Sequence, residues 1–180
     1  MKPIELTAPR LILRQWLPSD IEPFADMCAD KRVMQYYPDT LNRAQSKALI
    51  EHFSHLINKN GWGLWALQSR QNSEFIGFTG LNAVSNSLPF APNVEVGWRI
   101  AADYWRQGYA FEAASTVIDY GFSQLHLKGI VAFTSIENTP SLKLMEKLGM
   151  QFDQTFEHPA LPQDHKLKQH CLYRLKCHEE

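Results

Sequence analysis

The period of the apolar residues changes several times along the chain, and these changes predict the order of its secondary structure. Several stretches show the short alternating or continuous apolar pattern that is typical of strands. They are residues 5–17, 62–69, 74–84, 94–100, 129–136, 151–157 and 168–176. Other stretches repeat apolar residues every three or four positions, as amphipathic helices do. They are residues 20–29, 40–57, 111–122 and 140–148.

Polar residues and glycines predict where these elements begin and end. Ser19 or Asp20 is expected to cap the first helix, and Thr40 the second. Gly61 follows the second helix, as glycine commonly does at a helix end. The short polar segment 70–73 predicts a hairpin between the strands on either side of it.

The resulting order, β-α-α-β-β-β-α-β-α-β-β, predicts the α/β (α+β) class. We expect one mixed, mostly antiparallel sheet with helices on both faces. In its centre, strand 94–100, helix 111–122 and strand 129–136 form a βαβ unit, whose strands should be parallel. A chain of 180 residues can form a sizeable core, so we expect a single domain spanning residues 1–180.

The strongest chemical signal lies between strand 94–100 and helix 111–122. The sequence there is Trp105-Arg106-Gln107-Gly108-Tyr109-Ala110, with two small residues near the start of the helix. Small residues let a ligand approach the backbone, and the free N–H groups of a helix N-terminus attract phosphate. The turn therefore predicts a phosphate site; the alternative is that Gly108 only lets the chain enter the helix.

A second polar segment, Asn138-Thr139-Pro140-Ser141, follows strand 129–136. Ligands of open α/β sheets bind beyond the carboxyl ends of parallel strands, so both polar segments should face one crevice. Two simpler roles stay open here. Asn138 fits a helix cap, and Ser141 fits a first-turn residue with a solvated hydroxyl.

Composition narrows the possible partners. A formal net charge of -1 argues against a nucleic-acid-binding or anionic membrane-binding surface. Residues 1–14 lack a long apolar run, so neither a signal peptide nor a membrane span is expected there. The three cysteines form no C-x-x-C pair, which predicts reduced thiols and a cytoplasmic location. The histidines form no H-E-x-x-H motif, and no metal site is predicted.

Three groups of segments together resemble the GNAT superfamily of acetyl-CoA-dependent N-acetyltransferases, and in particular its RimJ/RimL-type branch. They are TAPRLILR at 7–14, VEVGW at 94–98 with YWRQGYAFEA at 104–113, and NTPS at 138–141 with EKLGM at 146–150. The resemblance covers nearly the whole chain. Each segment alone is a loose match, whereas all of them in this order and spacing make a specific one.

The resemblance implies that acetyl-CoA lies in a gap where strands 94–100 and 129–136 splay apart. Backbone N–H groups would hold its pyrophosphate, and the first of these strands would pair with its pantetheine arm. The residues concerned are Gln107, Gly108, Tyr109 and Ala110 for the pyrophosphate, and Trp98, Arg99 and Ile100 for the arm. Asn138 would bind the arm from the other strand. Arg106 is a candidate for the 3′-phosphate, and a solvated arginine is the alternative.

The sequence departs from the superfamily pattern at two positions. Trp105 occupies the first position of the superfamily pattern Arg/Gln-x-x-Gly-x-Gly/Ala, and a departure at this position is common in the branch. The tyrosine that protonates the leaving thiolate in many members falls on Met145, which has no proton to donate. The branch suggests that the hydroxyl of Ser141 protonates the thiolate instead. The alternative that the thiolate leaves without a dedicated acid stays open.

Direct attack by an amine requires a base, because an alkyl ammonium has a pKa of about 10. Glu95 is the candidate. The even-numbered apolar residues of strand 94–100 share one face, which places Glu95 on the other, toward the crevice. Apolar surroundings would raise its pKa. The alternative is an exposed glutamate or one paired with Arg99. We interpret Glu112 as a structural residue of the first helical turn, whose carboxylate interacts favourably with the positive end of the helix dipole.

Candidates for the acceptor pocket are Tyr36, Tyr37, Trp62 and His158, although core packing or a polar loop would also explain them. The implied acceptor is a primary amine, possibly a protein N-terminus such as that of a ribosomal protein. A small amine, an aminoglycoside and a catalytically silent acyl-CoA-binding module stay open, as does a monomer or a homodimer. An acidic pocket would favour a polycation, and a nearly neutral groove would favour a peptide.

Overall fold

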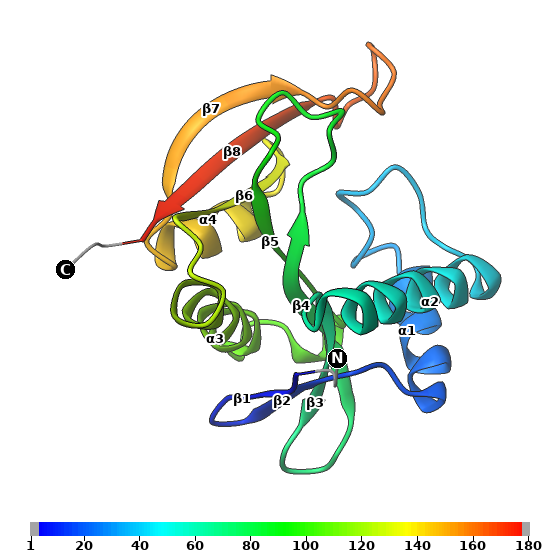
Figure 1. The fold of residues 1–180 in the computed structure, drawn as a ribbon. Helices are drawn as coiled ribbons and strands as arrows, with labels where there is room; N and C mark the ends of the chain where they lie inside the picture. Colours follow the sequence, from blue (N-terminus) through cyan, green and yellow to red (C-terminus); the bar gives the residue numbers. More distant parts are fainter. Residues whose placement is uncertain (1–3, 178–180) are drawn as a thin grey trace.

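The computed structural model describes residues 4–177 and contains one mixed, eight-stranded sheet (Figure 1). The strand order is β1-β2-β3-β4-β5-β6-β8-β7, and every neighbouring pair except β5–β6 is antiparallel. The strands are β1 (Leu6–Thr7), β2 (Leu11–Arg14), β3 (Leu64–Ser69), β4 (Phe75–Ala83), β5 (Val94–Ile100), β6 (Gly129–Ser135), β7 (Gln151–Glu157) and β8 (Gln169–Lys176).

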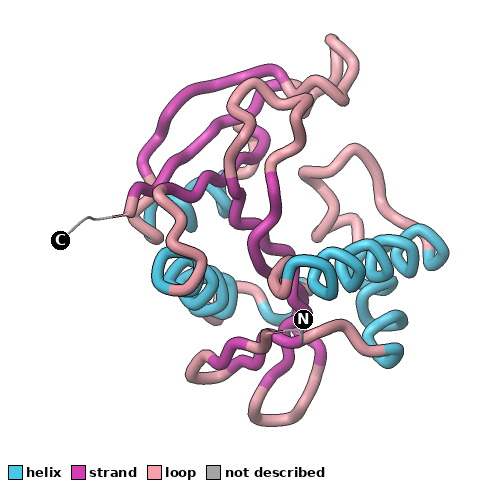
Figure 2. The backbone as a smooth tube through the Cα atoms, in the orientation of Figure 1, coloured by secondary structure: helices cyan, strands magenta, loops and turns pink. Residues whose placement is uncertain are grey.

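Helices cover both faces of the sheet (Figures 1 and 2). They are α1 (Ile21–Ala29), α2 (Arg43–Asn60), α3 (Tyr109–Ser123) and α4 (Thr139–Lys147), with the short 3-10 turns η1 (Pro18–Asp20) and η2 (Ala102–Tyr104). The helices α1 and α2 pack on β3 and β4, whereas α3 and α4 pack on the other side against β4, β5 and β6. This confirms the predicted α/β class.

The centre of the sheet is divided at its parallel pair. Antiparallel β4 and β5 stay in register over the whole of β5, from Gly77 opposite Ile100 to Ala83 opposite Val94. Parallel β5 and β6 are in register only at Glu95 and Val131, after which the two strands diverge. The predicted splay is therefore confirmed, and it opens beside the carboxyl end of β5.

The predicted first strand, 5–17, is wrong. Two short strands, β1 and β2, occupy this region, and a tight turn joins them in which the Ala8 N–H donates to the Leu11 carbonyl at 2.9 Å. Pro9 lies in this turn and has no N–H to give to a ladder, which explains why one continuous strand does not form.

Two helix caps also differ from the prediction. Asn42, not Thr40, caps α2: its side chain accepts from the Gln45 N–H, and Gln45 returns a bond to the Asn42 N–H. The Asp20 side chain makes no cap bond to α1. Its buried carboxylate instead accepts two hydrogen bonds from Arg14, at 2.7 and 2.9 Å. A tertiary ion pair thus takes the place of the expected local cap.

Candidate active site between β5 and β6

The turn before α3 has a backbone conformation that leaves its amides free. Gly108 is the N-cap of α3 with φ 83°, and Arg106 also has a positive φ of 60°. The first bond of this helix runs from the Glu112 N–H to the Gly108 carbonyl, at 3.0 Å. The N–H groups of Tyr109 and Ala110 precede it, so they have no intrahelical acceptor. This arrangement suits an anion.

Arg10, in the β1–β2 turn, supports this turn through several contacts. Its Nε donates to Glu112 at 2.7 Å and its Nη1 to the Gln107 carbonyl at 3.0 Å, while its guanidinium lies over the Tyr109 ring, 4.4 Å from the centroid. The Arg10 backbone N–H also donates to Glu112, at 2.6 Å. Sequence reasoning missed this contact, because the two residues are 102 positions apart.

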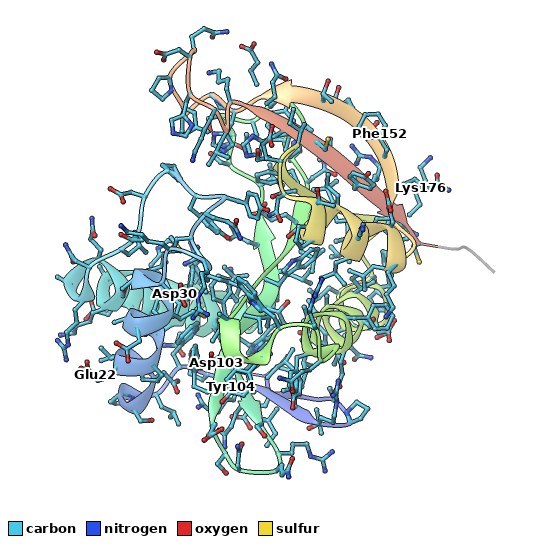
Figure 3. All side chains as sticks on the ribbon, turned by 180° about the vertical axis from the view of Figure 1, so that it is seen from behind. Glu22, Asp30, Asp103, Tyr104, Phe152 and Lys176 are labelled. Carbon is cyan, nitrogen blue, oxygen red and sulfur yellow. The ribbon has the colours of Figure 1, made fainter. Side chains whose placement is uncertain are left out.

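A cavity of about 520 Å³ lies between this turn, the end of β5 and the start of α4. The residues predicted for the coenzyme that line it are Trp98, Arg99, Ile100, Arg106, Gly108, Tyr109, Ala110, Asn138 and Ser141. Figure 3 labels Asp103 and Tyr104 in η2, the short turn that leads from β5 to this site. Gln107 does not line the cavity; its side-chain amide donates to the Asp103 carbonyl at 3.0 Å.

A second cavity, of about 440 Å³, meets the first at the splay. Residues that line both cavities are Tyr36, Tyr37, Trp98, Arg99, Asn138 and Ser141. Glu95 and His158 line only the second. The α1–α2 and β7–β8 loops both contribute residues to its wall. Trp62 lines neither cavity and instead packs against the core.

Glu95 is partly buried, and its Oε1 accepts a hydrogen bond from Asn82 Nδ2 at 3.0 Å. Burial raises the pKa of Glu95 above its ordinary value, and the bond from Asn82 opposes this only in part. Among the described residues, the recorded hydrogen-bond partner of Glu95 is Asn82, whereas Arg99 Nη1 donates to Cys28 Sγ at 3.2 Å.

Comparison with known proteins decides the family. The acetyltransferase (GNAT) domain family matches residues 10–151. The uncharacterized N-acetyltransferase YoaA of Bacillus subtilis is 33% identical over 81% of this chain and 82% of its own length. This chain belongs to the GNAT acetyltransferase family.

Solved structures show the same fold. An acetyltransferase (GNAT family) from Bacillus anthracis has a TM-score of 0.81 at 24% identity, and the match covers 96% of this chain and 98% of that one. A ribosomal-protein-S5-alanine acetyltransferase from Vibrio fischeri has a TM-score of 0.76 at 18% identity, and the match covers 96% of each chain. GNAT enzymes use acetyl-CoA as a co-substrate, so the two joined cavities are the candidate active site.

Hydrogen bonds organise the β6–α4 edge of the splay in this GNAT domain, and the bond between Trp98 and Ser141 crosses from this edge to β5. The Asn138 side chain caps α4, accepting from the Ser141 N–H at 3.3 Å, and donates to Thr134 Oγ1 at 2.9 Å. The Ser141 hydroxyl accepts a hydrogen bond from Trp98 Nε1 at 3.3 Å. Met145, the position expected for a tyrosine, is 2% exposed and lines the second cavity. The cap interpretation of Asn138 is therefore confirmed, and its side chain also reaches the cavity wall.

Arg99 is a fixed cation in the wall that the two cavities share. Its guanidinium stacks on the Tyr37 ring at 4.1 Å and lies 5.2 Å from the Phe78 ring centroid. Burial by itself lowers the pKa of Arg99, but Tyr37 and Cys28 raise it above its ordinary value, so the side chain stays charged. Its Nε is buried and has no hydrogen-bond partner among the described residues. No local sequence pattern predicts that Arg99 packs against these side chains.

The rings of His158 and His170 lie side by side in the wall of the second cavity, tilted by 46° with their centroids 4.9 Å apart. Burial lowers the pKa of His158, and the nearby Lys168 lowers it further. Burial also lowers the pKa of His170 to about 4. Both rings are therefore neutral near pH 7. The part of the chain that the structure describes contains no group of three or more metal-ligating side chains placed to hold an ion.

Proposed function

We propose that this GNAT protein transfers an acetyl group from acetyl-CoA to a primary amine. The observation that carries the proposal is the continuity of the site. Free amides at the start of α3 lie at one end, and a partly buried carboxylate, Glu95, lies in the adjoining cavity. An anionic coenzyme and an amine that must lose a proton require these two environments.

We assign the pyrophosphate to the backbone amides of residues 107–110, of which Gly108, Tyr109 and Ala110 line the first cavity. A side chain at Gly108 would be strained at its φ of 83°, and its Cβ would lie 3.4 Å from Arg10 Nη2, so this turn conformation favours glycine. We assign the backbone of Trp98, Arg99 and Ile100 to the pantetheine arm, with Asn138 on the opposite side. Arg106, which is exposed and lines the cavity, is our candidate for the 3′-phosphate.

The proposed reaction needs one base and one acid. The amine nitrogen forms a bond to the acetyl carbon, its proton passes to Glu95 or to a water held by Glu95, and the carbon–sulfur bond breaks. We assign protonation of the leaving thiolate to Ser141. Because its oxygen accepts from Trp98 Nε1, the hydroxyl proton of Ser141 is left to donate.

We place the protein in the RimJ/RimL-type branch on the strength of segments 7–14, 94–98, 104–113, 138–141 and 146–150. This branch makes a protein N-terminus the first acceptor to test and a small amine the second. A cytoplasmic location agrees with the three free cysteines. No helix among residues 4–177 combines the length and apolar character that a membrane crossing needs.

Release of free thiol from acetyl-CoA in the presence of an amine panel tests the proposal. The panel should contain N-terminal peptides, small monoamines, polyamines and an aminoglycoside. We expect thiol release that depends on at least one amine, together with a product that is heavier by one acetyl group. Coenzyme binding without release on any amine would contradict the proposal and indicate a silent acyl-CoA-binding module.

A further inference from the structure

The second cavity carries almost no net charge. Glu95 and Arg99 are its only charged lining residues among those the structure describes, and they have opposite signs. Most of the remaining wall is apolar or aromatic, and Phe53, Phe78 and Phe133 contribute rings to it. The cavity is therefore not the acidic pocket that would favour a polycation.

The far wall of this cavity adds no negative charge. The rings of His158 and His170 lie side by side, and the centroid of the Phe133 ring lies 6.4 Å from each of their centroids. Lys168 lies behind this wall, where its Nζ donates to the carbonyls of His158 and Leu161 at 3.1 and 2.7 Å. Lys168 is thus a positive charge beside this wall, fixed by two hydrogen bonds.

We propose that the acceptor is a primary amine attached to an apolar or aromatic group and carrying no second positive charge near the amine. This inference rests on the proposed function and narrows its acceptor. Glu95 would take the proton of the reacting amine, and the aromatic wall would cover the group attached to it. The same chemistry occurs in a free alkyl or aryl amine and at a peptide N-terminus whose first side chain is apolar.

Among the described lining residues, Glu95 is the one carboxylate, and it takes the proton of the reacting amine, so a second ammonium group in this cavity has no carboxylate of its own to pair with. Placing a charge in an apolar site without a partner is costly, and the fixed guanidinium of Arg99 adds repulsion. An apolar group of the same length incurs neither penalty and gains from contact with the rings. Discrimination should therefore appear between acceptors that differ only in a second charge.

Pentylamine and 1,5-diaminopentane form such a matched pair, and they differ by one terminal ammonium. We expect kcat/KM for pentylamine to exceed that for the diamine by about tenfold or more, which corresponds to at least about 1.4 kcal/mol. Two tripeptides, Phe-Gly-Gly and Lys-Gly-Gly, repeat the comparison at a peptide N-terminus and separate the two sources of the amine. Equal rates within both pairs, or faster reaction of the charged members, would overturn the inference.

A substitution in the cavity wall provides an internal control. Ala160 is exposed on the β7–β8 loop and lines the second cavity, so a larger side chain there can be accommodated at the surface. Ala160→Glu should raise the diamine-to-monoamine ratio of kcat/KM several-fold, because it supplies the missing carboxylate. Ala160→Gln has nearly the same shape without the charge and should leave the ratio as it is.

The outcomes separate this inference from the proposed function. If the protein binds no coenzyme A and releases no thiol with any amine, the proposed function fails. If thiol is released but only polyamines or aminoglycosides accept the acetyl group, the proposed function stands and the inference is overturned. If Ala160→Gln changes the ratio as much as Ala160→Glu does, charge is not the cause and the inference is also overturned.

Discussion

At the scale of single residues, Glu95 is the group whose surroundings matter most for chemistry. Its carboxylate lies in the second cavity, and burial raises its pKa. A base acts only when it is deprotonated, so kcat/KM should rise with pH through this raised pKa. The acid limb of the rate profile should consequently lie at higher pH than an ordinary glutamate would give.

Glu95→Gln should lower kcat/KM by about a hundredfold and remove that acid limb, because glutamine cannot accept the proton. The measurement is kcat/KM against pH for both proteins at saturating acetyl-CoA. Glu157→Gln removes an exposed carboxylate on β7 and should leave the profile unchanged. An unaltered profile in Glu95→Gln would exclude Glu95 as the base.

Only some of the site residues could be predicted from sequence, and the reason is physical. Gly108 and Asn138 were identified because a positive φ and a helix cap have local signatures. Arg99 contacts Cys28 across 71 positions, and no local pattern records such a contact. Trp62 was placed in the acceptor pocket because it is an aromatic residue near a loop, yet it packs against the core.

At the scale of elements, the β1–β2 turn and the start of α3 act together. Arg10 binds Glu112 and the Gln107 carbonyl, and so it fixes the turn whose amides face the cavity. Arg10 does not line that cavity, which makes it a positioning residue. Its side chain is 49% exposed and that of Glu112 is 12% exposed. The ion pair itself is therefore expected to contribute only modestly to stability.

Arg10→Ala should raise KM for acetyl-CoA roughly fivefold, a change of about 1 kcal/mol, with a smaller effect on kcat. Glu112→Arg should act in the same way, and combining Arg10→Glu with Glu112→Arg should recover part of the loss. Arg43→Ala removes an exposed ion pair with Glu22, labelled in Figure 3, and serves as the control. If Arg10→Ala and Arg43→Ala give the same KM for acetyl-CoA, the positioning role is wrong.

Elements with strong local boundaries were predicted best. The bounds of β5 and β7 agree with the sequence pattern at every residue, and α3 begins only two residues earlier than expected. The predicted strand 5–17 failed because a periodic apolar pattern continues through a turn that only Pro9 interrupts. Asp20 failed as a cap because Arg14 competes for its carboxylate from another element.

At the scale of the whole molecule, the parallel pair β5–β6 joins two antiparallel halves of the sheet. The first half contains β1 to β5, the second contains β6, β8 and β7, and the two are in register at one residue pair (Figure 1). Both cavities open along this division. The fold therefore forms the site where sheet hydrogen bonding is interrupted.

Global stability should depend on pH through His170. This residue is 9% exposed, and burial lowers its pKa to about 4, from about 6.5 in an unfolded chain. Between these values the unfolded chain binds a proton that the folded protein does not. The free energy of unfolding should therefore decrease as the pH falls through this window, by roughly 2–3 kcal/mol in total.

Urea unfolding at several pH values between about 4 and 7 measures this slope. His170→Phe keeps an aromatic ring beside Phe133 and Phe156 and should flatten the dependence. His55→Phe, an exposed site on α2, should leave it unchanged. The same slope in all three proteins would show that another group is responsible.

The central claim is that the amides at the start of α3 bind the diphosphate of the coenzyme, and calorimetric titration with coenzyme A tests it most directly. Gly108→Ala and Gly149→Ala place a side chain at nearly the same positive φ, 83° and 81°, but only Gly108 lies in the cavity wall. We predict heat with one site per chain for the wild type and for Gly149→Ala, and about tenfold weaker binding for Gly108→Ala. No heat with the wild type, or equal affinity in all three proteins, would contradict the account.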